Sequence, residues 1–251
     1  MPRYYTRACN FYFGKQSKIL VNKKQSIPLH QIKEISFDHV EIITRKKIRK
    51  ISINKIRYLP KKLKTKINSD LKKISSKKPN FSNFNFKKIP NILGVLNLTP
   101  DSFSDGGKFI KKNKGITHAI SLYKSGASII DVGGESTRPG SKPVHEKQEW
   151  NRIYKSLKLI VKKIPISLDT RKSRIMEDGI KMGVKLINDV SGLSYDPKTI
   201  DVLKKYKIPF VIQHSVGTPE NMQKKAKYKN ELLDIYDYFD DKIKLIRSKG
   251  I

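Results

Sequence analysis

Cysteine, acidic residues and long uncharged apolar runs are all scarce in this 251-residue sequence. Its one cysteine, Cys9, excludes an internal disulfide and a metal centre built from several cysteines. The first residues lack the continuous apolar core of a signal peptide. No uncharged run approaches the roughly 18 residues needed to cross a bilayer. These absences predict a cytoplasmic protein without a membrane span.

The acid deficit leaves a large positive charge, with 22 acidic residues against 54 lysines and arginines and a formal net charge of +32. Such a charge raises nucleic acid or an anionic membrane surface as a partner. However, only ten of the 54 basic residues are arginine, the residue that base and phosphate recognition favours. Lysine also accompanies asparagine and isoleucine throughout the chain. We therefore expect small anionic substrates as partners, and neither nucleic acid nor a membrane.

Residues 1 to 90 differ in composition from the rest, with 24 basic against 4 acidic residues. Apolar patterns at 4–13 and 35–43 predict strands, and the apolar spacing between Leu59 and Ile74 predicts a lysine-rich amphipathic helix. A polar, repetitive stretch at 75–90 is typical of a linker. The apolar content is thin for an independent core. We predict a basic α+β extension, with a partly ordered arm or a nucleic-acid-binding arm as alternatives.

After residue 90, apolar runs of strand length alternate with helical patterns. Strands are expected at 92–97, 127–132, 165–168, 186–188 and 209–213, and helices at 114–124, 146–163, 173–182, 197–206 and 230–248. This alternation predicts an α/β fold with a parallel sheet. Polar residues gather after four successive strands, where α/β barrels place their chemistry. Residues 91–251 are therefore predicted to form a barrel of about five βα units.

The loop after the first of these strands is unusually rich in polar and turn-forming residues. It begins at Asn97 and places an aromatic, Phe103, between Asp101 and Asp105. A loop that only joined two elements would have little need for this mixture. We interpret it as the first active-site loop.

The other strand ends carry carboxylates and amides that would converge on one mouth of a barrel. Asp169 and Asn188 suit a flat heterocycle with several donors and acceptors, because a carboxylate accepts two donors and an amide offers both roles. Asn97 offers a hard oxygen suited to Mg²⁺ beside a phosphate. Asp131, Asp189 and His214 also stand at strand ends and are open to two interpretations: they join the site, or Asp131 and Asp189 organise loops and His214 packs. Trp150 is expected to be a packing residue.

Five ordered motifs give the chain a specific resemblance. They are NLTPDSFSDGG (97–107), DVGGESTRPG (131–140), SLDT (167–170), INDVSG (187–192) and GTPENMQ (217–223). Together they resemble the successive motifs of dihydropteroate synthase. The resemblance implies a TIM (β/α)8-type barrel and a transferase of folate biosynthesis. That activity joins 4-aminobenzoate to 6-hydroxymethyl-7,8-dihydropterin diphosphate, assisted by Mg²⁺, and releases 7,8-dihydropteroate and pyrophosphate. A homodimer is compatible with a full-length form.

The resemblance also implies roles for individual residues. Asn97 corresponds to the metal and diphosphate ligand, and Asp169 and Asn188 correspond to pterin-binding residues, with Asp169 also favouring a cationic pterin. The remaining positions shape the aminobenzoate pocket: Phe103 and Asp105 in a first mobile loop with a catalytic role, and Thr137, Arg138 and Pro139 in a second. Closure of these loops would exclude water from the reacting cation.

The chain also departs from the family pattern. Family members continue into a sixth strand with a D-P-G-x-G-F-G-K motif, which is absent here, and Gln213-His214-Ser215 replaces a methionine-rich segment. We therefore expect an incomplete barrel with two open flanks, either as a fragment of a longer reading frame or completed by a partner. A non-catalytic pterin-binding subunit is the first alternative function. A pterin-dependent methyltransferase domain is the second, although it would not need the 97–107 loop.

Overall fold

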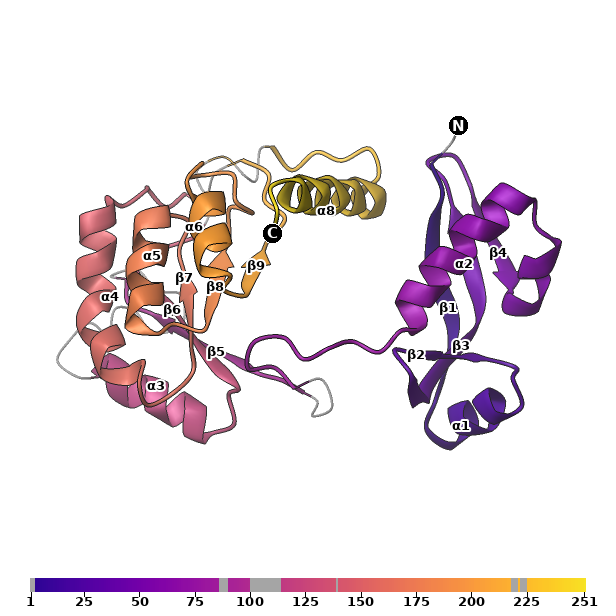
Figure 1. Cartoon of the computed structure of the whole chain (residues 1–251), viewed down its shortest axis with the longest axis horizontal. Coiled ribbons are helices and arrows are strands. Elements are labelled where there is room, and N and C mark those ends of the chain that lie inside the picture. Colours follow the sequence, from indigo (N-terminus) through magenta and orange to yellow (C-terminus); the bar gives the residue numbers. More distant parts are fainter. Residues whose placement is uncertain (1–2, 86–89, 100–113, 139, 218–220, 222–224) are drawn as a thin grey trace. The chain divides into compact units, whose positions relative to one another are not determined.

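The computed structural model describes residues 3–85, 90–99, 114–138, 140–217, 221 and 225–251. The chain divides into two compact units, Met1–Pro79 and Asn80–Ile251 (Figure 1). Among the described residues, no helix is long and apolar enough to cross a membrane.

The first unit is built on an antiparallel sheet centred on its longest strand. That strand, β3, pairs with β1 on one side and with β2 and β4 on the other. The elements are β1 (Tyr5–Phe13), α1 (Gly14–Asn22), β2 (Ile27–Leu29), β3 (Ile32–Ile43), β4 (Ile48–Ser52), the 3-10 helix η1 (Ile53–Tyr58) and α2 (Lys61–Ser75). Beyond α2, residues 76–85 contain an isolated bridge between Phe81 and Phe84.

A separate hydrophobic core holds this unit together, although its composition had indicated little material for one. Ile67 and Leu71 of α2 pack with Phe37, Val40 and Ile51 of the sheet. The core draws on β4 and η1, two short elements with one lysine and one arginine each, which the sequence pattern did not reveal. Among the alternatives for the extension, the structure favours an α+β unit over a partly ordered arm.

The second unit contains a five-stranded parallel sheet in the order β5-β6-β7-β8-β9, with helices joining successive strands (Figure 1). Its elements are β5 (Leu93–Asn97), α3 (Lys114–Lys124), β6 (Ile129–Gly133), α4 (Glu146–Ile160), β7 (Ile166–Asp169), α5 (Ser173–Met182), β8 (Leu186–Asp189), α6 (Thr199–Tyr206), β9 (Phe210–Ile212) and α8 (Glu231–Ser248). The predicted α/β architecture of about five βα units is confirmed. The ends of its strands and helices lie within three residues of those expected.

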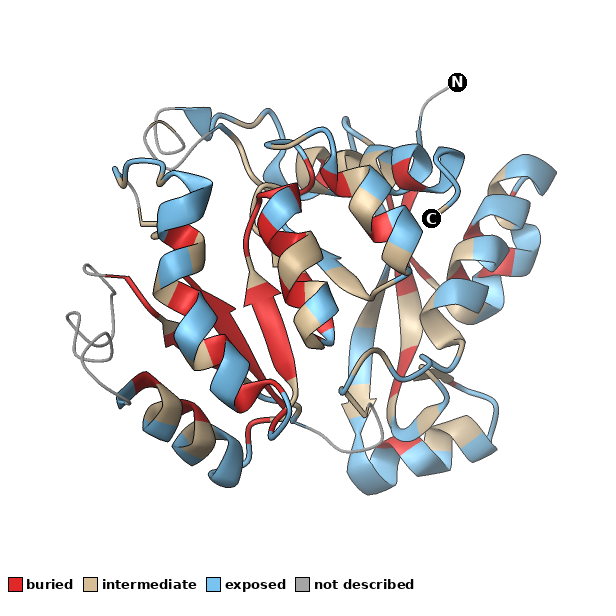
Figure 2. Cartoon of the chain, turned by 60° about the vertical axis from the view of Figure 1, so that its left-hand side comes forward, coloured by how far each residue is buried: buried red, intermediate tan, exposed pale blue. Residues whose placement is uncertain are grey.

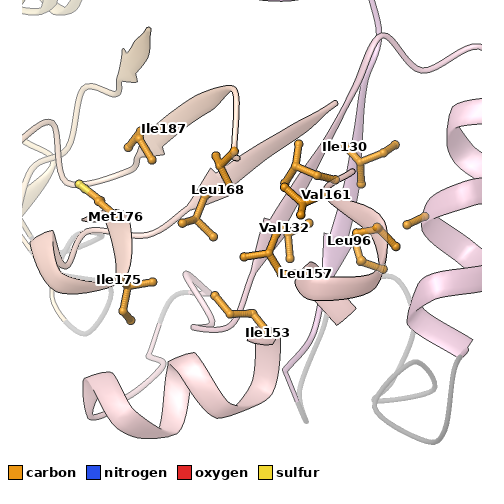
Figure 3. Close-up of a cluster of buried hydrophobic side chains, with 14 of the residues drawn as sticks. Leu96, Ile130, Val132, Ile153, Leu157, Val161, Leu168, Ile175, Met176 and Ile187 are labelled. Atoms are coloured by element: carbon orange, nitrogen blue, oxygen red, sulfur yellow. The ribbon is translucent and has the colours of Figure 1, made fainter. Parts of the chain in front are cut away.

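Alternate residues of the strands face the helices and form the core of this unit. Leu96, Val132 and Leu168, from three neighbouring strands, gather with Ile153 and Leu157 of α4 (Figure 3). The central strands are buried beneath the helices, whose exposed faces point away from the sheet (Figure 2). Since side chains alternate along a strand, the residues between these apolar positions lie on the opposite face of the sheet.

The two outer strands of the parallel sheet each have one open edge within the described part of the chain. β5 pairs with β6 alone and β9 with β8 alone. Val95 on β5 is 48% exposed and Val211 on β9 is 37% exposed. Apolar side chains therefore reach solvent at both flanks, as the incomplete barrel predicts.

Candidate active site

The strand register brings three of the predicted site residues to one level of the sheet. Gly133 of β6 pairs with Asn97 of β5 on one side and with Asp169 of β7 on the other, and Asp169 pairs with Asn188 of β8. A methyl group placed on Gly133 would lie 3.2 Å from Asp169 Oδ2 and 3.6 Å from Asn97 Oδ1. This glycine therefore leaves open a space that the Asn97 and Asp169 side chains border.

Asp131 belongs to the same group of side chains and lies two residues before Gly133 on β6. Asn188 Nδ2 donates a hydrogen bond of 2.9 Å to Asp131 Oδ2, which fixes the orientation of the amide. The other carboxyl oxygen, Oδ1, accepts no hydrogen bond of normal geometry within the described part of the chain. Burial raises the pKa of Asp131 even though Asn188 donates to it. Its role is to orient Asn188 within the site, rather than to cap a loop.

Asp169 is the most strongly perturbed acid of this group. Burial raises its pKa well above the ordinary value, and the neighbouring carboxylate of Asp131 raises it further. Both effects disfavour the charged form. A ligand that donates N–H groups or carries positive charge would reverse both effects, so the site is matched to such a ligand.

Behind the strand ends, a buried ion pair joins the loop after β6 to the loop after β7. Arg171 donates to Glu135 through Nε at 2.8 Å and through a terminal nitrogen at 3.1 Å. The backbone N–H of Val144 also donates to Glu135, at 2.8 Å, and so closes the loop that holds Thr137 and Arg138. Burial acts to raise the pKa of Glu135, but Arg171 and Val144 outweigh it and hold that pKa below its usual range.

A second carboxylate, Glu149 of α4, extends this network. Lys172 Nζ contacts Glu135 at 3.0 Å and also Glu149, and Thr170 Oγ1 donates to Glu149 at 2.6 Å. We had not singled out Glu149 or Lys172 from the sequence. One signal was available, because Glu149 stands four residues before Ile153 on the buried stripe of the helix. A carboxylate on an apolar stripe requires a buried partner.

Further out, the loops after β6, β7, β8 and β9 enclose a cavity of about 340 Å³. Thr137, Arg171, Ser191 and His214 are among its lining residues, whereas Asp169 and Asn188 are not. The structure therefore separates the predicted residues into a group at the strand ends and a group at the loop cavity. Phe103, Asp105 and Pro139 lie outside the described residues.

Three other residues have the structural roles expected of them. Asp189 accepts hydrogen bonds from the N–H groups of Ser191 and Leu193, at 2.8 and 3.1 Å, and organises that loop. His214 packs edge-on against Tyr238 of α8, with ring centroids 4.7 Å apart. Trp150 packs against the core of the parallel-sheet unit.

A parallel α/β sheet with buried carboxylates and an amide at its strand ends is typical of α/β enzymes, which place their binding sites there. Residues 93–251 match the model of a family described as pterin binding enzyme. This match spans more than half of the chain, which therefore belongs to the pterin-binding enzyme family.

Within that family, the relatives of this chain include dihydropteroate synthases of several bacteria. It is 37% identical over 172 residues to the enzyme of Bacillus subtilis, covering 68% of this chain and 58% of the relative. The enzyme of Clostridium beijerinckii is 39% identical over 170 residues, covering 67% and 61%.

A crystal structure of Yersinia pestis dihydropteroate synthase with a sulfonamide drug complex superposes with a TM-score of 0.63 at 33% identity. The match covers 67% of this chain and 61% of that one. The chain thus spans about three fifths of the length of its relatives.

Proposed function

We propose that the chain is a dihydropteroate synthase, or the larger part of one, and acts in folate biosynthesis. The reaction joins 4-aminobenzoate to 6-hydroxymethyl-7,8-dihydropterin diphosphate and releases pyrophosphate. The observation that carries this proposal is the convergence of Asn97, Asp169 and Asn188 at one level of the sheet, in a chain whose relatives are dihydropteroate synthases.

The pterin is assigned to the strand ends. Because Asn188 donates its amide N–H to Asp131, its carbonyl oxygen remains available as an acceptor for a ring N–H. Asp169 would accept from the amino-pyrimidine edge. As diphosphate departs, positive charge develops on the pterin methylene and ring, and this charge favours the ionised form of Asp169. The same interaction stabilises the transition state more than the ground state.

Asn97 is assigned to the diphosphate end, where Mg²⁺ would bind. Among the described residues there is no group of three or more His, Cys, Asp or Glu side chains that could hold a metal. Asn97 offers a single oxygen donor, which fits an ion held also by water and mainly by the substrate diphosphate, as Mg²⁺ commonly is. When bound, Mg²⁺ neutralises charge on the leaving diphosphate.

The aminobenzoate is assigned to the second loop, through Thr137 and Arg138, together with Phe103, Asp105 and Pro139. An arginine suits the carboxylate of this substrate because its guanidinium donates two parallel hydrogen bonds. The contact of Glu135 with Val144 holds the ends of this loop in place. A homodimer of a longer form and a cytoplasmic location stay predictions.

Two other functions are known alternatives for a chain with this barrel and pterin site. A non-catalytic pterin-binding subunit is favoured by the open edges of β5 and β9 within the described residues, since such a subunit would need a complementary chain. A pterin-dependent methyltransferase domain has no such support, and the NLTPDSFSDGG segment at 97–107 argues against it.

The proposal is tested by replacing Asp169. In the enzyme completed to a whole barrel, Asp169→Ala should lower pteroate formation at least about a hundredfold, or about 2.7 kcal/mol of transition-state stabilisation. The assay measures pteroate from the pterin diphosphate and 4-aminobenzoate, with Asp201→Ala, an exposed acid on α6, as the control. Near-normal turnover by the Asp169 variant would refute its role. If the unaltered chain binds pterin without turnover, the non-catalytic pterin-binding subunit is favoured. If the unaltered chain neither binds pterin nor forms pteroate, the proposal is refuted.

A further inference from the structure

The charge excess of the chain is concentrated in the first unit. Met1–Pro79 carries 22 lysines and arginines against 4 acidic residues, a net charge of +18, whereas the other 172 residues carry +14. The first unit also holds five of the ten arginines. If the chain were simply rich in lysine throughout, the positive charge of each unit would be in proportion to its length. The concentration therefore needs a local explanation.

Each of the four carboxylates of this unit already has a lysine, arginine or histidine neighbour, so none is left to pair with the other basic residues. The pairs are Lys18–Glu34 at 2.8 Å, His39–Asp38 at 2.5 Å, Arg7–Glu41 at 2.6 Å and Lys66–Asp70 at 2.5 Å. Between Glu41 and Asp70 the sequence contains no acidic residue. The remaining lysines and arginines of that stretch therefore project a positive field into solvent.

Six of these basic residues, with one tyrosine, form what we call the basic hairpin surface. Its members are Lys46, Lys47, Arg49, Lys50, Lys55, Arg57 and Tyr58, all exposed. They lie on the β3–β4 turn, on the edge strand β4 and on η1.

The basic hairpin surface stands on an ordered scaffold rather than on a loose tail. The turn is closed by a hydrogen bond of 2.9 Å from Thr44 N–H to the Lys47 carbonyl. β4 pairs in register with β3, and Ile51 of β4 and Ile56 of η1 are buried in the core of the unit. The chain thus holds these charges on one ordered hairpin, with Arg49 and Lys50 on opposite faces of β4, at a cost in electrostatic repulsion.

An exposed aromatic ring marks the same surface. Tyr58 is 72% exposed, and the guanidinium of Arg57 lies 4.7 Å from the centre of its ring. Basic side chains that follow a phosphate backbone, interleaved with an aromatic platform on which a base can stack, are the features of single-strand binding proteins. An anionic membrane would instead favour a broad apolar face, and Ile48 is the one large apolar side chain exposed on β4.

We propose that the Met1–Pro79 unit binds single-stranded nucleic acid through the basic hairpin surface. Its lysines and arginines contact successive phosphates, and Tyr58 stacks on a base. Recognition of this kind tolerates many sequences and depends strongly on salt. The proposal does not depend on the function assigned to the parallel-sheet unit. It revises the expectation, drawn from overall composition, that nucleic acid is not a partner.

The test measures binding of the full chain to fluorescein-labelled oligo-uridine and oligo-thymidine by anisotropy, across a series of salt concentrations. The variant Lys46→Gln/Lys47→Gln/Arg49→Gln/Lys50→Gln should bind at least about tenfold more weakly. Its plot of log affinity against log salt should be less steep by about 3, from a slope of about 0.7 per phosphate contact on a single strand. Tyr58→Ala should weaken binding about fivefold or more with an unchanged salt slope.

A matched control removes the same charge from the parallel-sheet unit. Lys155, Lys158, Lys162 and Lys163 are exposed on α4 and the turn after it, and replacing all four with Gln should change affinity less than twofold. Circular dichroism checks that each variant is folded. Equal losses in both quadruple variants would show a net-charge effect and overturn the proposal. So would binding to phosphatidylserine vesicles but not to oligonucleotides, or no binding by the unaltered chain at low salt.

Discussion

Asp169 shows how a single residue of the candidate site lowers the folding stability of the chain. Its carboxyl group is buried near Asp131, and its pKa is raised well above the usual value of 3.8. The folded chain therefore keeps this proton to a higher pH than the unfolded chain does. Folding stability must fall as the pH rises from about 3.8 through the raised pKa, and the full cost is present above it. A cationic ligand would remove that cost, which couples binding to ionisation.

Because ionised Asp169 lowers folding stability, we predict that Asp169→Asn stabilises the chain at pH 8. An amide cannot ionise, so each unit by which the pKa is raised contributes about 1.4 kcal/mol, and roughly 2–4 °C in Tm follows from each kcal/mol. Thermal unfolding followed by circular dichroism at pH 4, 6 and 8 measures the effect. The gain should shrink towards pH 4, and Asp201→Asn should show no such trend. A lower Tm for the Asp169 variant at pH 8 would contradict the assignment.

The motifs identified Asn97, Asp169 and Asn188 as candidates, but they could not supply the partners of these residues. The bond from Asn188 to Asp131 joins positions 57 residues apart in the sequence. The contact of Lys172 with Glu149 spans 23 residues. Which polar groups meet inside a protein depends on how its helices and strands pack, and no local pattern records that choice.

At the scale of the elements, periodicity predicted most of the parallel-sheet unit because each helix has one apolar face and each strand is a short, mainly apolar run. Helix α5 shows how tightly such elements fit. A methyl group added to Gly179 of α5 would lie 2.4 Å from Leu168 Cδ2 of β7. The glycine therefore lets α5 approach the sheet closely, just behind the strand that carries Asp169.

Gly179→Ala should consequently destabilise the chain by about 1–3 kcal/mol, because it overpacks a filled core. Urea unfolding measures the change. Leu168→Ala should cost less in the Gly179→Ala background than by itself, since it removes the clashing atoms, and a double-mutant cycle reports that coupling. Asn151→Ala on the exposed face of α4 serves as a control, with an expected change within about 0.5 kcal/mol. Additive effects at Gly179 and Leu168 would contradict the packing described.

The same periodicity revealed less of the first unit. It predicted β1, β3 and α2, but it did not predict α1, β2, β4 and η1, which the structure contains. These elements have nine residues or fewer, so their apolar residues are too few to show a period. Ile51 and Ile56 contribute to a core only because β4 pairs with β3 and η1 folds back beneath the sheet.

For the whole molecule, the open edges of the parallel sheet carry the main physical consequence. Backbone groups on the free side of a strand can pair with another chain, and nearby exposed apolar side chains favour that contact. Val211 of β9 is such a side chain. We therefore expect the 251-residue chain to self-associate with rising concentration.

A charge placed at this edge should reduce that self-association. We predict that Val211→Lys shifts the light-scattering mass at high concentration towards the monomer, because a lysine on an edge strand must be desolvated when another strand pairs with it. Leu159→Lys, at a 50% exposed position on α4, adds the same charge away from the edge and should have little effect. A chain that stays monomeric without either change would show that these edges do not drive association.

The sequence by itself determined the alternation of strands and helices, the family and the positions that carry polar groups, since all three are recorded in local pattern and motif. Only the tertiary structure decided three further features. It set Asp169 beside Asp131, linked two loops through Glu135 and Arg171, and packed Ile51 of β4 and Ile56 of η1 into one core with helix α2. Each depends on distances between residues that are remote in the chain, and those distances exist only once the cores have packed.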